Sequence, residues 1–254
     1  MTYPRRMTEL EALIPPHEPA EDTLATVGGI ALDSIPLLGP IAGRALDHAL
    51  AARERERRHE FDTAVVAEVQ RLAERTRAAL TVADVVNSDD FIATLARTRR
   101  EAAETASRTK RQRLARAAVA ALDPGALSRA EREDYHRLIA DLDDLHIWLL
   151  AYFAGPRAWL DAHGLTHAYQ QITAGSPQVH LETALAHFGV TFSAPVVAAL
   201  ADLERLGLAD VQERTLRNFS TASGMLEPRT TPRGRAFLAY LGDGSPATAD
   251  LAEA

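Results

Sequence analysis

Two Glu-x-x-His pairs are the residues of this chain whose type and spacing come closest to a metal site. They are Glu56 with His59 and Glu133 with His136. Helical di-iron proteins use two such pairs with two further carboxylates, all directed into a helix bundle. At 100° per residue, however, Glu56, His59 and Glu133 fall opposite the apolar faces of their predicted helices. The sequence therefore predicts no metal at these pairs.

Other chemical signatures are equally weak. His163 and His167 stand at positions i and i+4 with Asp161 nearby, but no third ligand follows at a spacing typical of zinc. Exposed polar histidines are the plainer interpretation. The chain has no cysteine, which excludes a thiolate nucleophile and a disulfide. No nucleophile elbow, P-loop or dinucleotide fingerprint occurs. The sequence predicts no catalytic residue and no cofactor, and thus a protein that is not an enzyme.

A basic stripe runs along one predicted helix. Its members are Arg97, Arg99, Arg100, Arg108, Lys110, Arg111, Arg113 and Arg116. Such a stripe could face phosphates of nucleic acid or lipid, or pair with an acidic helix. We favour pairing with the next predicted helix, which offers Glu131, Glu133, Asp134, Asp141, Asp143 and Asp144. The candidate contacts to phosphate or to an acidic partner are Arg97, Arg100, Arg108, Lys110 and Arg111.

The composition restricts the partners of the whole chain. Its 254 residues carry a formal net charge of −7, so no chain-wide positive field is available for nucleic acid. No signal peptide is evident, because the first apolar run begins late and follows Glu18, Glu21 and Asp22. We expect a cytoplasmic protein, peripheral to or inserted in the inner membrane if its apolar run contacts lipid.

That apolar run, residues 23–43, is the apolar arm. It is rich in glycine and proline and has one charge, Asp33. About 20 apolar residues can cross a bilayer, and Gly39 with Gly43 forms a G-x-x-x-G helix-contact motif. Burying Asp33 costs about 2.5–3.5 kcal/mol, whereas each Leu or Ile returns only about 0.3–0.6 kcal/mol. A re-entrant or oligomer-lined hairpin, and an arm packed on protein, both remain open. The candidate contacts are Ile30, Asp33, Ile35, Leu37, Leu38, Gly39, Ile41 and Gly43.

The elements that position these residues read as long helices. Residues 1–22 contain four prolines and are expected to be a flexible leader. Helical periodicity then predicts a bundle over residues 44–155, made of helices over 44–80, 88–122 and 128–153. Ser128 and Glu131 form a capping box at the start of the third helix. Residues 156–177 read as a connector with one short helix around Trp159.

The C-terminal part changes style and predicts a winged-helix-like domain over residues 178–241. Helices are expected over 179–187, 194–206 and 231–241, with strands over 209–215 and 225–230, and residues 242–254 form a disordered tail. The candidate nucleic-acid contacts are Arg214, Arg217 and Arg229. Residues 178–254 hold six arginines against nine acidic residues, a formal charge of −3. A protein contact is therefore favoured, and a DNA-binding regulator is the alternative.

The order of these motifs resembles the bacterial abortive-infection alpha (Abi-alpha) proteins over roughly residues 24–241. The segments that carry the resemblance are Ile35-Pro36-Leu37-Leu38-Gly39-Pro40, Thr109-Lys110-Arg111, Leu142 to Leu150, and Thr231 to Leu238. The resemblance implies a role in phage defence and a link to the membrane, and it supplies no catalytic residue. Together, these expectations describe a mainly α, non-enzymatic bacterial effector or accessory protein. Its partners would be a second copy, another protein or a membrane, and less readily nucleic acid.

Overall fold

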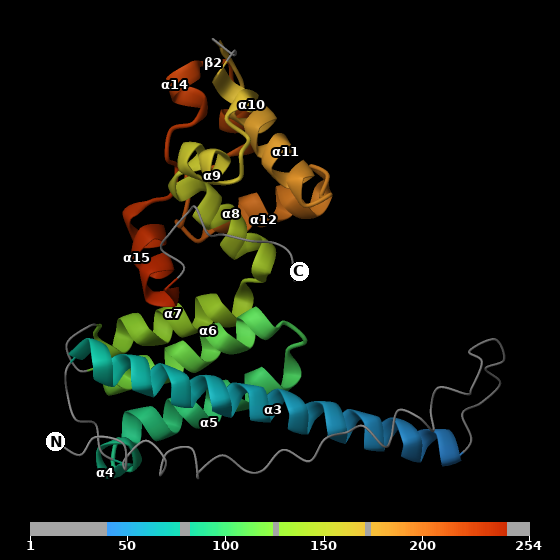
Figure 1. Cartoon of the computed structure of the whole chain (residues 1–254), viewed down its shortest axis with the longest axis vertical. Helices are drawn as coiled ribbons and strands as arrows, with labels where there is room; N and C mark the ends of the chain where they lie inside the picture. Colours follow the sequence, from blue (N-terminus) through green and yellow to red (C-terminus); the bar gives the residue numbers. More distant parts are fainter. Residues whose placement is uncertain (1–39, 77–81, 124–126, 171–173, 243–254) are drawn as a thin grey trace. The chain divides into compact units, whose positions relative to one another are not determined.

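A computed structural model describes residues 40–76, 82–123, 127–170 and 174–242 (Figure 1). These residues are mainly helical, which confirms the expected α class. The expected leader, most of the apolar arm and nearly all of the expected tail lie outside the described residues. The chain divides into two compact units, residues 1–136 and residues 137–254, called unit 1 and unit 2.

Unit 1 is built on one long helix, α3, against which two shorter helices pack. Its helices are α3 (Pro40–Thr76), α4 (Val82–Val86), α5 (Asp89–Glu104), α6 (Arg108–Val119), a 3-10 turn (Ala120–Leu122) and the first part of α7 (Arg129–Asp141). α3 contacts both α5 and α6, which also contact each other (Figure 1). The apolar face predicted for the first helix is buried, namely Phe61, Val65, Val69 and Leu72.

The expected helix over 88–122 is in fact two helices, α5 and α6. The chain leaves helical geometry at Thr105, which is extended, and restarts behind Ser107. The Ser107 hydroxyl accepts a hydrogen bond from the Lys110 amide at 3.0 Å and so caps α6. The break allows α5 and α6 to fold back on each other and to bury Ala102 and Leu114 against α3. A continuous helix could not make both contacts.

The expected helix over 128–153 is likewise broken, into α7 and α8 (Asp144–Ala154). The predicted capping box at its start is present, since the Ser128 amide donates to Glu131 Oε2 at 2.8 Å. Asp143 then caps α8 in a second box with His146. α8 packs on helices of unit 2, so the observed division falls inside the bundle expected over 44–155.

Unit 2 surrounds the apolar helix α8, whose residues 147–153 are all buried. Its other elements are α9 (Pro156–Ala162), α10 (His167–Gln170), β1 (Ala174–Gly175), α11 (Pro177–His187), α12 (Ala194–Arg205), α13 (Glu213–Arg217), β2 (Ser220–Thr221), α14 (Ala222–Met225) and α15 (Pro232–Leu241). β1 pairs antiparallel with β2 in the register Ala174↔Thr221 and Gly175↔Ser220. α12 and α15 both pack on α8. The short helix expected around Trp159 is α9, and its Trp159 is fully buried.

The expected wing hairpin differs from what forms. Within the described residues, the strands predicted over 209–215 and 225–230 reduce to one antiparallel bridge, Ala209↔Thr230. Helix α13 begins inside the first predicted strand and buries Leu216 against α11 and α12, and α14 ends at the first residue of the second predicted strand. The three expected helices of this region are present as α11, α12 and α15. Gly234 lets α15 approach closely, since an added Cβ would lie 2.1 Å from the Leu208 carbonyl oxygen.

No helix within the described residues combines the length and apolarity needed to cross a bilayer.

Candidate functional site

Within the described residues, a groove with a volume of about 470 Å³ runs along the seam between α3 and α6. From α3 it takes Glu60, Ala64 and Glu68, which recur every four residues and so share one face. Ala64 and Ala67 have short side chains, which leave open space between the two helices. We call this hollow the α3–α6 groove, and its walls are mainly charged.

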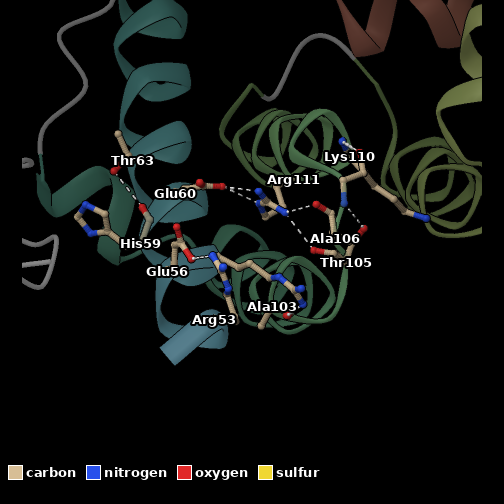
Figure 2. A network of polar contacts seen from close by, with 12 residues as sticks. Arg53, Glu56, His59, Glu60, Thr63, Ala103, Thr105, Ala106, Lys110 and Arg111 are labelled. Atoms are coloured by element: carbon tan, nitrogen blue, oxygen red, sulfur yellow. Dashed lines mark hydrogen bonds and ion pairs between the residues drawn. The ribbon is translucent and has the colours of Figure 1, made fainter. Parts of the chain in front are cut away.

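Arg111 forms one fixed wall of the groove. Its side chain is only 8% exposed. Nε donates to Glu60 Oε2 at 3.0 Å and Nη2 donates to the same oxygen, while Nη1 donates to the carbonyls of Thr105 and Ala106 at 3.0 and 2.9 Å (Figure 2). One guanidinium thus ties α3 to the turn between α5 and α6. Arg111, expected as a phosphate or acidic-partner contact, is a structural clamp.

A second cation serves the same turn from α3. Arg57 Nη1 donates to the Ala103 carbonyl at 3.2 Å. The last carbonyls of a helix have no partner within it, and cations at that end also favour its dipole. Arg57 and Arg111 therefore stabilise the end of α5 from two different helices.

Glu68 holds the far end of the groove. It accepts from Arg116 Nε at 3.1 Å and from Arg71 Nη1 at 2.9 Å, and its own side chain is 11% exposed. The two Nη groups of Arg116 make no contact to residues that the structure describes. The Nη groups of Arg116 are therefore available to donate to a ligand.

Arg108, the first residue of α6, lies at the other end of the groove. It is exposed and makes no ion pair or hydrogen bond within the described ranges. Four arginines thus line the groove against two glutamates, which leaves a local excess of two positive charges. This arrangement suits an anionic ligand.

The rest of the basic stripe is largely paired. Arg97 forms a two-pronged contact with Glu133 of α7, at 2.8 and 3.2 Å, and this hydrogen bonding lowers the pKa of Glu133. Arg99 pairs with Asp62 of α3 at 2.6 Å, although burial still raises the pKa of Asp62. Apart from Arg97, the acidic partners of the stripe lie mainly on α3, whereas the sequence pointed to the third helix. Arg100 is exposed on α5.

The Glu-x-x-His pairs do not assemble a metal site. His136 is buried, and its Nε2 lies 2.9 Å from Glu101 Oε1 of α5, while Glu133 faces Arg97. No group of three potential metal ligands occurs in the part of the chain that is described. His163 instead stacks on the Trp159 ring, with centroids 3.9 Å apart.

Unit 2 contains a histidine held between two carboxylates. His146 Nδ1 lies 2.5 Å from Asp143 Oδ1, and its Nε2 lies 3.6 Å from Asp202 Oδ2 of α12. Burial alone would lower the pKa of His146, but the hydrogen bonds and charges of Asp143 and Asp202 raise it overall. The hydrogen bond from His146 lowers the pKa of Asp143. Sequence reasoning missed this cluster, whose signal was the Asp143-x-x-His146 spacing.

The three arginines expected at a DNA-binding wing do not share one. Arg217 pairs with Glu213 at 2.6 Å and donates to Gln178 at 3.2 Å. Arg229 donates to the Gly224 carbonyl at 3.4 Å and is partly buried. Arg214 is exposed on α13. Helix α13 thus carries Arg214, where a strand was predicted, and also Arg217.

Of the apolar-arm candidates, Ile30, Asp33, Ile35, Leu37, Leu38 and Gly39 lie outside the described residues, whereas Ile41 and Gly43 belong to α3. Comparison of the chain with family models, with curated proteins and with solved structures gives no match.

Proposed function

We propose that this chain is a non-enzymatic bacterial effector or accessory protein of phage defence. It acts through contact of the apolar arm with a membrane or a second copy, and unit 2 docks a partner protein. One observation carries the proposal: no side chain of α3 between residues 48 and 60 is buried, and the hydrogen bonds of this stretch to α5 and α6 come from its last turn, at Arg57 and Glu60. The resemblance to the abortive-infection alpha proteins supports the biological setting.

The two halves of α3 differ sharply in burial. Between residues 48 and 60 no side chain is buried, and Leu50 is 60% exposed. Among the described side chains of α3, the first buried one is Phe61. Figure 1 shows the blue end of α3 continuing past α5 and α6. We call residues 48–60 the free half of α3.

Local ion pairs stabilise the free half. Arg53 pairs with Glu56 at 2.8 Å, and Arg58 pairs with Glu54 at 2.5 Å, each one helical turn apart. A helical stretch that buries no apolar face depends on such pairs, each worth about 0.2–0.5 kcal/mol. At 1.5 Å per residue, the free half spans about 20 Å. A spacer of this kind would hold the apolar arm away from the packed helices, where lipid or another copy can reach it.

Light scattering with and without vesicles tests this proposal. The full chain should either self-associate or bind vesicles of bacterial anionic lipid. Leu37→Glu with Leu38→Glu should abolish that behaviour, because two charges enter the centre of the apolar arm. Leu10→Glu with Leu13→Glu makes the same chemical change in the leader and should have no effect. A full chain that stays monomeric and ignores vesicles would refute the role of the apolar arm.

The phage-defence setting has its own test. Cells that express the full chain should resist part of a phage panel in plaque assays. Cells that express the Leu37→Glu, Leu38→Glu chain at equal level should not. Equal plaque counts for both and for an empty vector across the panel would separate the protein from phage defence.

DNA binding is not proposed. Helix α12 has no Arg or Lys before Arg205, and α13 replaces the last three residues of the first strand of the expected wing. Arg217 and Arg229 are engaged within unit 2. A salt-dependent gel shift that is lost on Arg214→Glu with Arg217→Glu would revive it.

A further inference from the structure

We propose that the α3–α6 groove binds a small phosphate-bearing ligand, of the class of a nucleoside diphosphate. This goes beyond the proposed function, because it assigns a ligand to unit 1 that needs neither the apolar arm nor unit 2. It would give the protein a soluble signal to which it could respond.

Charge is the first argument. The groove carries an excess of two positive charges in a chain whose formal net charge is −7. A phosphate monoester carries about −1.5 to −2 near neutral pH. The groove is therefore a local exception whose positive charge suits a ligand with one or more phosphates. Most of the surface of this net-negative chain is expected to attract an anion less strongly than the groove does.

The second argument is that the acidic residues of the groove are already occupied. Glu60 is held by Arg111, whose remaining donors are fixed on the carbonyls of the α5–α6 turn. Glu68 accepts from Arg116 and Arg71. Neither glutamate is paired with Arg108, so the Arg108 guanidinium at the groove mouth is available to a ligand.

The placement of the unused donors favours a ligand with more than one phosphate. Arg108 and the Nη groups of Arg116 are two turns apart on α6, about 12 Å along the axis, with Gln112 between them. Arginine forks and the Gln112 amide all donate to phosphate oxygens. Because Arg108 begins α6, the positive end of that helix dipole adds to the field there. A single inorganic phosphate would be too short to use both ends.

The available space fits a small molecule. The groove volume of about 470 Å³ lies in the range of about 300–1,000 Å³ typical of small-ligand sites. Its floor is set by Ala64 and Ala67. The Thr63 hydroxyl donates to the His59 carbonyl at 2.9 Å, which leaves its oxygen as an acceptor for a ligand hydroxyl.

Calorimetric titration of the full chain with pyrophosphate and, separately, ADP tests the proposal at an ionic strength of about 0.15 M, where charges more than about 8 Å apart are largely screened. Both should bind, and Arg108→Ala should weaken each by about tenfold or more, as expected for a charge-assisted hydrogen bond. Arg100→Ala is the matched control, since it removes an exposed arginine of α5 outside the groove. It should leave the affinity within about twofold, because exposed and distant charges are largely screened.

A second variant separates shape from charge. Ala67→Leu fills the floor and should weaken binding of ADP without altering net charge. Equal affinities for ADP and pyrophosphate would show that the phosphates account for the binding. Tighter binding of ADP would show that the nucleoside contributes as well. The absence of binding to the unmodified chain at millimolar ligand would overturn the proposal. Equal losses of affinity in Arg108→Ala and Arg100→Ala would overturn it too. If Ala67→Leu fails to fold, the comparison of these two arginine variants decides the question.

Discussion

Unit 1 and unit 2 bury their helices by different means. The core of unit 1 is rich in alanine, with Ala102, Ala103, Ala115, Ala117 and Ala118 all buried, and arginines cross between its helices. The core of unit 2 is aromatic. Trp148 stacks on Tyr152 with ring centroids 5.5 Å apart and meets Trp159 and Phe188 edge-on at 5.6 and 5.7 Å.

The difference shows what each core depends on. Alanine lets helices approach closely but removes little apolar area from water, so unit 1 gains more of its specificity from polar clamps such as Arg111. Each large aromatic side chain buries about 150–250 Å² and favours edge-to-face contact. Unit 2 should therefore be sensitive to lost volume, and unit 1 to lost charge.

The largest effect is expected from Trp148→Ala. It should lower the free energy of unfolding of unit 2 by about 3–5 kcal/mol, because it leaves a cavity among three aromatic rings. Both tryptophans of the chain, Trp148 and Trp159, lie in unit 2, so urea unfolding followed by Trp159 fluorescence reports on that unit. A loss below about 1 kcal/mol would mean that the cluster contributes little.

In unit 1 the corresponding change is Arg111→Met, which keeps the length and removes the charge. It should cost about 2–4 kcal/mol, because two turn carbonyls and Glu60 lose their partner. Hydrogen exchange of α5 and α6 should accelerate. Arg58→Met, which breaks an exposed pair on α3, should cost no more than about 0.5 kcal/mol. If Arg111→Met and Arg58→Met lowered the free energy of unfolding by similar amounts, the expected dependence of unit 1 on the Arg111 contacts would be wrong.

The His146 cluster makes part of the stability of unit 2 depend on pH. The folded-state pKa of His146 is raised, so its contribution is full below about pH 6.5 and is lost as pH rises through the raised value. The folded-state pKa of Asp143 is lowered, so its contribution is present above about pH 3.9 and is lost as pH falls through the lowered value.

His146→Gln should therefore cost more at pH 5.5 than at pH 8.5, by about 0.5–1 kcal/mol, the range of partly exposed ion pairs. Urea unfolding of both proteins at both pH values measures the difference. His180 is buried with its pKa lowered by burial, and it acts in the opposite sense. Comparing variant with parent at each pH cancels that contribution. If His146→Gln cost the same free energy of unfolding at both pH values, His146 would not form a charged pair with Asp143 and Asp202.

The smallest effect is expected in the free half of α3. Arg53→Ala should change the free energy of unfolding by less than about 0.5 kcal/mol, since Arg53 is 60% exposed and contacts only Glu56 among the described residues. Far-UV circular dichroism during thermal unfolding would measure it. A larger loss would indicate that the free half is packed on something, such as a second copy.

Sequence patterns predicted the faces of helices better than their ends. The spacing of Phe61, Val65, Val69 and Leu72 identified the packed side of α3, because burial follows the helical period. The breaks at Ser107 and Asp143 were missed, because apolar periodicity continues across both and a polar cap inside such a pattern looks like an exposed helical residue. Only the tertiary contacts show that a helix broken at these points and folded back buries more apolar surface.

The groove was partly predictable. The basic stripe named Arg108 and Arg111 together, but it could not separate them, since their different roles depend on the turn at residues 105–107. The glutamates of the groove lie on α3, which is about 50 residues away in sequence. Similarly, the strand predicted over 209–215 was locally plausible, and the replacement of its last three residues by α13 accompanies the burial of Leu216.

The free half of α3 fixes a direction as well as a distance. A rigid helix transmits rotation, so inserting or deleting one residue between 48 and 60 turns everything before it by about 100° relative to the groove and shifts it by about 1.5 Å. A change of seven residues is nearly two whole turns and almost restores the original orientation. In such a protein the length of the surface helix is under geometric constraint, whereas among its described residues only Arg57 and Glu60 of the last turn are held by contacts to other helices.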